Sequence, residues 1–136
     1  MMIREIVLCC TLAIPLPAAS LTLCEILDDV DVGELQLAQG LAQCRASLAL
    51  GGARSVHCVL EYEYRSDSAT QVFSELTDAL VACSDPAVTM IEDQSVNHPD
   101  AFVLRTFENA LNTYAVSIKD KGALQQTLVF VRVTRP

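Results

Sequence analysis

Hydrophobic residues follow a helical spacing in two segments of the chain. In residues 34–50, four apolar residues recur at steps of four, three and four, which is typical of one helix face: Leu37, Leu41, Cys44 and Leu48. The pair Gly51-Gly52 predicts the end of this helix. A second helix is predicted over residues 68–84, after capping side chains at 66–68 and before the stop at Asp85-Pro86.

Other segments follow the period-two alternation of β-strands. Residues 55–64 alternate apolar and polar side chains, which predicts a strand with one buried face. The last third of the chain predicts four more strands with polar or glycine-containing turns between them, over residues 88–91, 101–107, 112–118 and 125–133.

The resulting order of elements is α-β-α-β-β-β-β. Two helices are too few to cover both faces of such a sheet, so we expect them to pack together on one face. The sequence therefore predicts an α+β two-layer sandwich with a mainly antiparallel sheet of about five strands. Its first β-α-β unit is a candidate for a parallel strand pair with a right-handed crossover.

The N-terminal segment has the layout of a secretory signal peptide. A basic residue, Arg4, precedes an apolar run at 6–16, and small residues lead up to Ser20. The run is about 11 residues long, against the roughly 20 that a membrane-spanning helix needs. We predict cleavage after Ser20, no membrane anchor afterwards, and a single domain over 21–136 in a secreted or periplasmic location.

Composition narrows the classes of protein that the chain can represent. Hydrophobic residues make up 51% and charged residues 19%, which excludes a disordered chain. Nine Lys and Arg against 17 Asp and Glu give a net charge of -8. This balance argues against a nucleic-acid partner, because phosphate binding needs a basic surface. Loss of residues 1–20 removes Arg4 and Glu5 alone among these charges, so the predicted domain keeps the same net charge.

Four cysteines remain in the predicted domain: Cys24, Cys44, Cys58 and Cys83. An even number in a small exported domain predicts two disulfide bonds, and the wide spacing does not match a zinc site. Cys58 and Cys83 each lie about 23 Å from the turn that joins their strand and helix, by the rises of the two elements. This favours pairing Cys58 with Cys83 and Cys24 with Cys44. The pairing of Cys44 with Cys58 and Cys24 with Cys83 stays open, because Cys44 is about 10 Å from its own turn.

Two histidines are the candidates for acid–base chemistry. His57 shares a strand face with Glu61 and Glu63, and His98 lies in a polar loop. A His–carboxylate pair is one interpretation, and a solvated surface is the simpler one. The chain has no nucleophile elbow and no phosphate-binding glycine loop. We therefore assign no catalytic residue, cofactor or metal.

Aromatic residues offer a further candidate site, a pocket between sheet and helices. Packing in the core explains them more simply. They are Tyr62, Tyr64, Phe102, Phe107, Tyr114 and Phe130.

We predict a small exported binding or protein-interaction domain, such as an accessory subunit or an inhibitor, with a protein or small-molecule partner. Its candidate surface residues are His57, Glu61, Glu63 and His98. An exposed apolar patch at Gln125–Val133 or around Tyr62 and Tyr64 would favour this hypothesis, whereas a fully polar, charged outer sheet face would oppose it. The alternative is a small periplasmic hydrolase-type enzyme that uses His98 or His57 with a nearby carboxylate.

Overall fold

The computed structural model describes residues 13–16, 20–48, 50–85, 88–92 and 99–136. Their elements follow the order α1 (Leu23–Asp28), β1 (Gly33–Leu37), β2 (Gly40–Leu48), β3 (Arg54–Glu63), α2 (Asp67–Cys83), β4 (Val88–Glu92), β5 (Phe102–Glu108), β6 (Thr113–Lys121) and β7 (Gln126–Arg135). Short 3-10 helices lie at Leu50–Gly52 and Gly122–Leu124.

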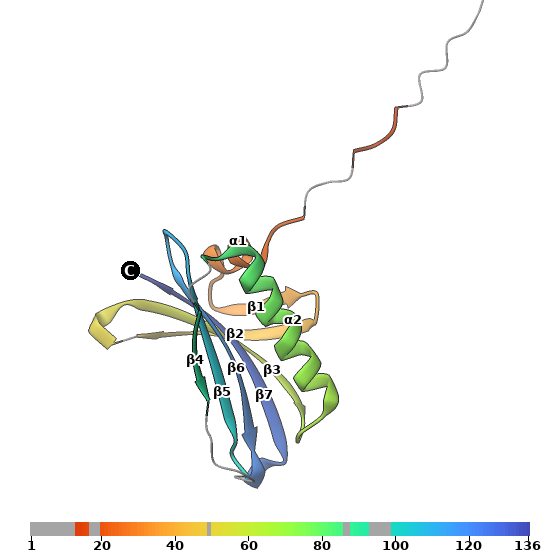
Figure 1. The fold of residues 1–136 in the computed structure, drawn as a ribbon, viewed down its shortest axis with the longest axis vertical. Helices are drawn as coiled ribbons and strands as arrows, with labels where there is room; N and C mark the ends of the chain where they lie inside the picture. The colour runs from red at the N-terminus through yellow and green to blue at the C-terminus, as the bar shows by residue number, and fades with distance from the viewer. Residues whose placement is uncertain (1–12, 17–19, 49, 86–87, 93–98) are drawn as a thin grey trace, which may run out of the picture.

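The strands form one sheet in the order β1-β2-β3-β7-β6-β5-β4 (Figure 1). Both helices contact the same face of this sheet, so the predicted α+β sandwich is confirmed. The sheet has seven strands, two more than expected. All neighbouring strands are antiparallel, and β7, β6 and β5 separate β3 from β4. The predicted parallel pair is therefore absent from the described sheet.

The predicted helix over residues 34–50 is wrong, because this segment forms the β1–β2 hairpin. Leu37 pairs with Gly40 across a two-residue turn, and Gly40 has φ +146, which favours glycine. Leu41 and Cys44 are three residues apart, so in a strand their side chains face opposite sides of the sheet. Leu41 is accordingly 50% exposed, whereas Cys44 is 3% exposed. The helical spacing therefore coincided with two short runs of strand alternation.

The other predicted elements are confirmed within a few residues. The Ser66 side chain accepts a hydrogen bond from the Ala69 backbone and caps α2, as the sequence predicts. At the last hairpin, β6 continues to Lys121 and the connection to β7 is the short 3-10 helix. The strand therefore continues a few residues beyond its predicted end at 118.

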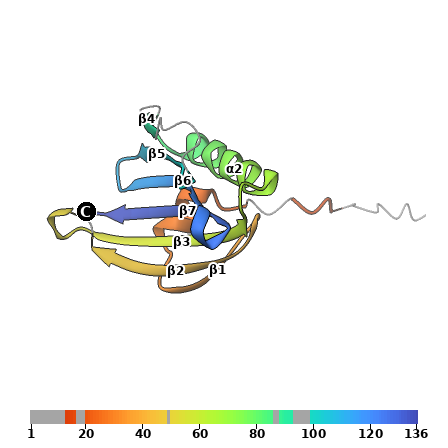
Figure 2. The ribbon, with the colours of Figure 1, turned by 90° about the horizontal axis from the view of Figure 1, so that it is seen from below.

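The core lies between the sheet and α2, which Figure 2 shows lying along one side of the sheet. The inward-facing side chains of β7, which are Val129, Val131 and Val133, are nearly fully buried. Phe73, Leu76 and Leu80 of α2 are buried against them. Burial of each such side chain contributes about 1.5–3 kcal/mol to stability. This hydrophobic layer fixes which face of every strand remains open to solvent.

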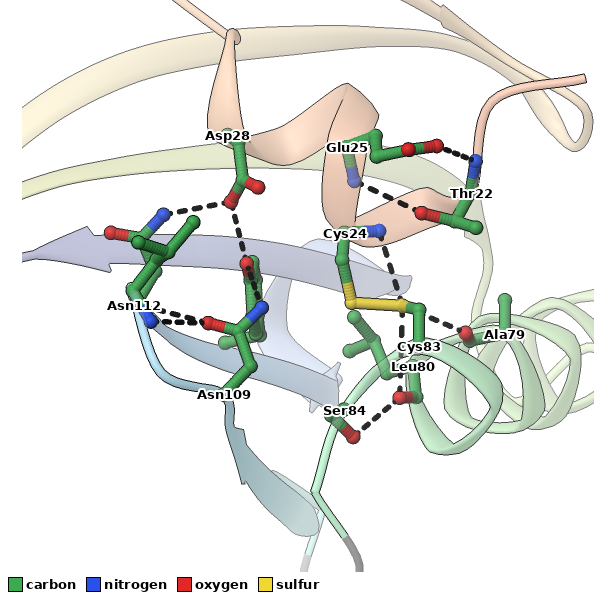
Figure 3. Close-up of a disulfide and its surroundings, with 12 residues drawn as sticks. Thr22, Cys24, Glu25, Asp28, Ala79, Leu80, Cys83, Ser84, Asn109 and Asn112 are labelled. Atoms are coloured by element: carbon green, nitrogen blue, oxygen red, sulfur yellow. Dashed lines mark hydrogen bonds between the residues drawn. A yellow bond between two sulfur atoms is a disulfide. The ribbon is translucent and has the colours of Figure 1, made fainter.

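Two disulfide bonds form, and together they use all four predicted cysteines. Cys24 pairs with Cys83 and joins α1 to the end of α2 (Figure 3). Cys44 pairs with Cys58 directly across β2 and β3. The favoured pairing was therefore wrong and the alternative is the one observed. The error follows from the predicted helix, because a strand at 40–48 places Cys44 opposite Cys58.

The first helix among the described residues begins close to the predicted cleavage position. Thr22 and Glu25 form a capping box at the start of α1, with the Thr22 N–H donating to Glu25 at 2.7 Å. Before it, Ile14 and Leu16 are 85% and 92% exposed. The remainder of the predicted signal peptide, 1–12 and 17–19, lies outside the described residues. Within the described ranges, no helix has the length and apolar character to cross a membrane.

Candidate functional site

The candidate surface residues of β3 lie on the open face of the sheet, as their alternation predicts. Cys58 and Leu60 are buried beneath the helices, so His57, Glu61 and Glu63 point to the opposite side. His98 lies outside the described residues.

His57 contacts an aromatic ring on this face. Its ring centre is 6.3 Å from that of Phe130, at an interplanar angle of 58°. Among the residues with described positions, no carboxylate forms an ion pair or a hydrogen bond with His57. The predicted His–carboxylate pair is therefore not formed by His57 within this part of the chain.

His57 lines a hollow of about 270 Å³ on the open face. Side chains from five adjacent strands, β2, β3, β7, β6 and β5, surround it. They are Ser47, His57, Phe130, Arg132, Ala115, Ser117, Phe102 and Leu104. We call this feature the open-face hollow.

The floor of the open-face hollow is unusually well covered for a sheet face without a helix. Ala115 and Ser117 are 4% and 8% exposed. The register explains their burial, because Ser117 lies between Phe130 of β7 and Leu104 of β5. The Ser117 hydroxyl has no hydrogen-bond partner within the described ranges, so its bonding capacity remains available to a ligand.

Two rows of different chemistry cross the open face at this point. The basic row places His57 between Arg45 on β2 and Arg132 on β7. The apolar row lies two residues further along each strand and contains Val59, Phe130 and Leu104, with Ser117 between the last two. Two residues along a strand span roughly 6.6 Å. The basic row and the apolar row are therefore close enough for one small molecule to contact both.

The guanidinium groups of the basic row have no acidic partner in the described part of the chain. The ion pair found there joins Arg65 to Asp120 at 3.1 Å, and neither Arg45 nor Arg132 takes part in another. In a chain with a net charge of -8, these two arginines form a locally basic surface beside the hollow.

A cluster of polar side chains away from the hollow connects α1 to the sheet through hydrogen bonds (Figure 3). Asp28 Oδ1 accepts hydrogen bonds from the Tyr114 hydroxyl at 2.5 Å and from Asn112 Nδ2 at 2.7 Å. Asn109 Nδ2 donates to the same tyrosine oxygen at 2.8 Å. Burial raises the pKa of Tyr114, and the hydrogen bond to Asp28 raises this pKa further. The Tyr114 hydroxyl both donates and accepts a hydrogen bond, so this cluster attaches α1 to the sheet.

Arg135 completes the attachment of α1. Its Nη2 atom donates to the backbone oxygens of Leu27, Asp28 and Val30 at 3.1, 2.9 and 2.7 Å. These carbonyls lie at the end of the helix, where backbone acceptors lack partners within the helix itself. The interaction therefore stabilises the C-terminal end of α1.

The simpler interpretation of the aromatic residues, packing in the core, holds for part of the set. Phe107 and Tyr114 are fully buried beneath the helices, whereas Phe102 and Phe130 line the open-face hollow. Sequence reasoning missed Arg132, Ser117 and Leu104. The alternation of β7 places Phe130 and Arg132 on one face, but the neighbours of β7 are set by the strand order.

Comparisons with known proteins provide no family or function for this chain. No family model, curated protein or solved structure matches it. The described residues also contain no group of three side chains that could hold a metal ion.

Proposed function

We propose that the chain is an exported binding domain whose ligand site is the open-face hollow. Two disulfide bonds support an oxidising location outside the cytoplasm. The capping box at Thr22 supports cleavage after Ser20, because the first helix keeps both of its capping residues after such a cut.

The binding role is supported by the combination of polar and apolar side chains that line the hollow. Its lining includes Ser117, a residue that is 8% exposed, and the exposed Arg132. Phe102, Leu104 and Phe130 supply apolar contact surface on the sheet face opposite the core. Ligand sites typically combine apolar walls with a few polar groups that fix orientation. The volume of about 270 Å³ suits a small molecule.

The hydrolase hypothesis has no corresponding support at His57. Its imidazole lies against Phe130 and, in the region that the structure describes, has no carboxylate to orient it. We therefore build the proposed function on binding alone.

The export part of the proposal is tested by expressing the full chain with its own N-terminus and measuring the intact mass of the product. We expect a chain that begins at Leu21 and lacks four hydrogens relative to its reduced form. A product that retains Met1, or one with free thiols at Cys24 and Cys83, would contradict export.

The binding part is tested on that product by amide-resolved NMR with a set of small aromatic probes of different charge. We expect their shifts to cluster at Ala115, Ser117 and Phe130. Ser117→Leu would fill the floor of the hollow and abolish these shifts. Gln43→Leu, an equally apolar change at an exposed site on the same face, is the matched control and would retain them. Shifts that are unaffected by Ser117→Leu would contradict this site.

A further inference from the structure

We propose that the open-face hollow selects a small amphipathic anion, with an acidic head group on the basic row and a flat apolar body on the apolar row. This inference rests on the proposed function of the hollow and specifies the chemistry of its ligand.

The basic row provides the recognition of charge. Arg45 and Arg132 lie on either side of His57 in register, and Arg132 also lines the hollow. An arginine can bind a carboxylate through two parallel hydrogen bonds, and such charge-assisted bonds are about twice as strong as neutral ones. His57 has at least one ring N–H to donate in either protonation state. The Ser117 hydroxyl adds a donor at the floor.

The apolar row provides the recognition of shape. Phe130 and Leu104 lie on opposite sides of the small Ser117 side chain, so a flat group can rest on the floor between them. The centre of this row is roughly 6.6 Å along the strand from the basic row. This separation matches an aromatic acid whose carboxylate is attached directly to a two-ring body.

The overall charge favours a small anion over an acidic protein. An acidic protein surface would cover much of a domain with a net charge of -8 and meet repulsion outside the hollow. A small monoanion interacts mainly with charges within the screening length of about 8 Å at physiological ionic strength. Strand register places Arg45 and Arg132 beside His57, and the Lys119 Nζ atom lies 5.9 Å from the ring centre of Phe102, so the charged groups identified around the hollow are basic.

The test is a calorimetric and NMR titration of the exported, disulfide-bonded protein with four probes. 2-Naphthoate carries both features, 2-naphthamide removes the charge, 2-naphthylmethylammonium reverses it, and acetate removes the apolar body. We expect 2-naphthoate to bind about tenfold or more tightly than 2-naphthamide, and the other two more weakly still. A fourfold increase in salt should weaken binding of 2-naphthoate and leave that of 2-naphthamide unchanged.

Variants assign the charge preference to the basic row. Arg132→Gln should reduce 2-naphthoate affinity about tenfold, to the level of the amide, with little effect on the amide itself. Arg132→Lys should restore part of the preference, because it keeps the charge but loses the two-pronged geometry. Arg54→Gln is the matched control, since Arg54 is exposed on the same strand as His57 but does not line the hollow.

The possible outcomes separate this inference from the proposed function. If 2-naphthamide binds the hollow as tightly as 2-naphthoate, the inference is overturned and the binding site stands. If none of the four probes shifts residues of the hollow, both are overturned. If 2-naphthoate is preferred equally by the Arg132→Gln variant, the preference arises elsewhere and the assignment to the basic row is wrong.

Discussion

The two faces of the sheet share the same strands but differ in the chemistry of their side chains. On the helix-covered face, Val131 and its neighbours are almost completely buried, and every side chain contributes to one packed layer. On the open face, the alternate residues of these strands include Ser117, aromatic side chains and two arginines, and within the described ranges neither Ser117 nor these arginines have a polar partner. Because alternate residues of a strand face opposite sides, stability and recognition can be encoded almost independently in one sheet.

The largest expected difference between the faces concerns two phenylalanines of β5. Phe107→Ala would remove a fully buried ring and reduce the free energy of unfolding by about 3–5 kcal/mol. Phe102→Ala lies on the open face and should cost about 1 kcal/mol or less. Urea denaturation of the two variants measures both values. Equal losses would show that the open face is also part of the stabilising core.

The two disulfides should contribute unequally to stability. Cys24–Cys83 closes a separation of 59 residues and Cys44–Cys58 one of 14. Restriction of the unfolded chain predicts about 4 kcal/mol for the first and about 3 kcal/mol for the second. Paired Cys→Ser variants, compared by thermal unfolding, should therefore rank in this order. The reverse ranking would show that the attachment of α1 matters less than the β2–β3 pairing.

The hydrogen bonds of Tyr114, which attach α1 to the sheet, should contribute less to the free energy of unfolding than either disulfide. Tyr114→Phe removes the hydroxyl that Asp28 and Asn109 bind and should reduce stability by about 1–3 kcal/mol. The folded state raises the pKa of Tyr114, so the stabilising contribution is complete below the ordinary pKa near 10 and declines as pH rises beyond it. The stability difference between wild type and variant should therefore shrink above pH 10. A difference that stays constant between pH 8 and pH 11 would contradict this account.

The smallest expected effect on stability is that of Arg132→Gln on the open face. Arg132 is exposed and has no ion pair in the part of the chain described, so the change should alter the free energy of unfolding by about 0.5 kcal/mol or less. The same variant should lose most of its affinity for 2-naphthoate. A large loss of stability would instead assign Arg132 a structural role.

Local patterns predicted much of the fold. The alternation over residues 55–64 and 125–133 located β3 and β7, and the capping serine located α2. The segment at 34–50 was misread because its apolar spacing fits a helix, while the two-residue turn before Gly40 is a weak signal. That single error also gave the wrong disulfide pairing, since only a strand places Cys44 opposite Cys58.

The candidate site was predictable only in part. The alternation of β3 correctly placed His57 on the open face with Glu61 and Glu63. The hollow itself depends on the order in which β2, β3, β7, β6 and β5 lie side by side. Arg45, Arg132 and Ser117 are distant in sequence and become neighbours through strand pairing, which local spacing does not encode.

The central claim is that recognition belongs to the open-face hollow and stability to the opposite face. The most direct test is an amide-resolved NMR titration of the disulfide-bonded protein with 2-naphthoate. We expect the largest chemical-shift changes at Ala115, Ser117, Phe130 and Arg132. Largest changes along α2 or at the β2–β3 hairpin tip, or no changes at saturating probe, would contradict the claim.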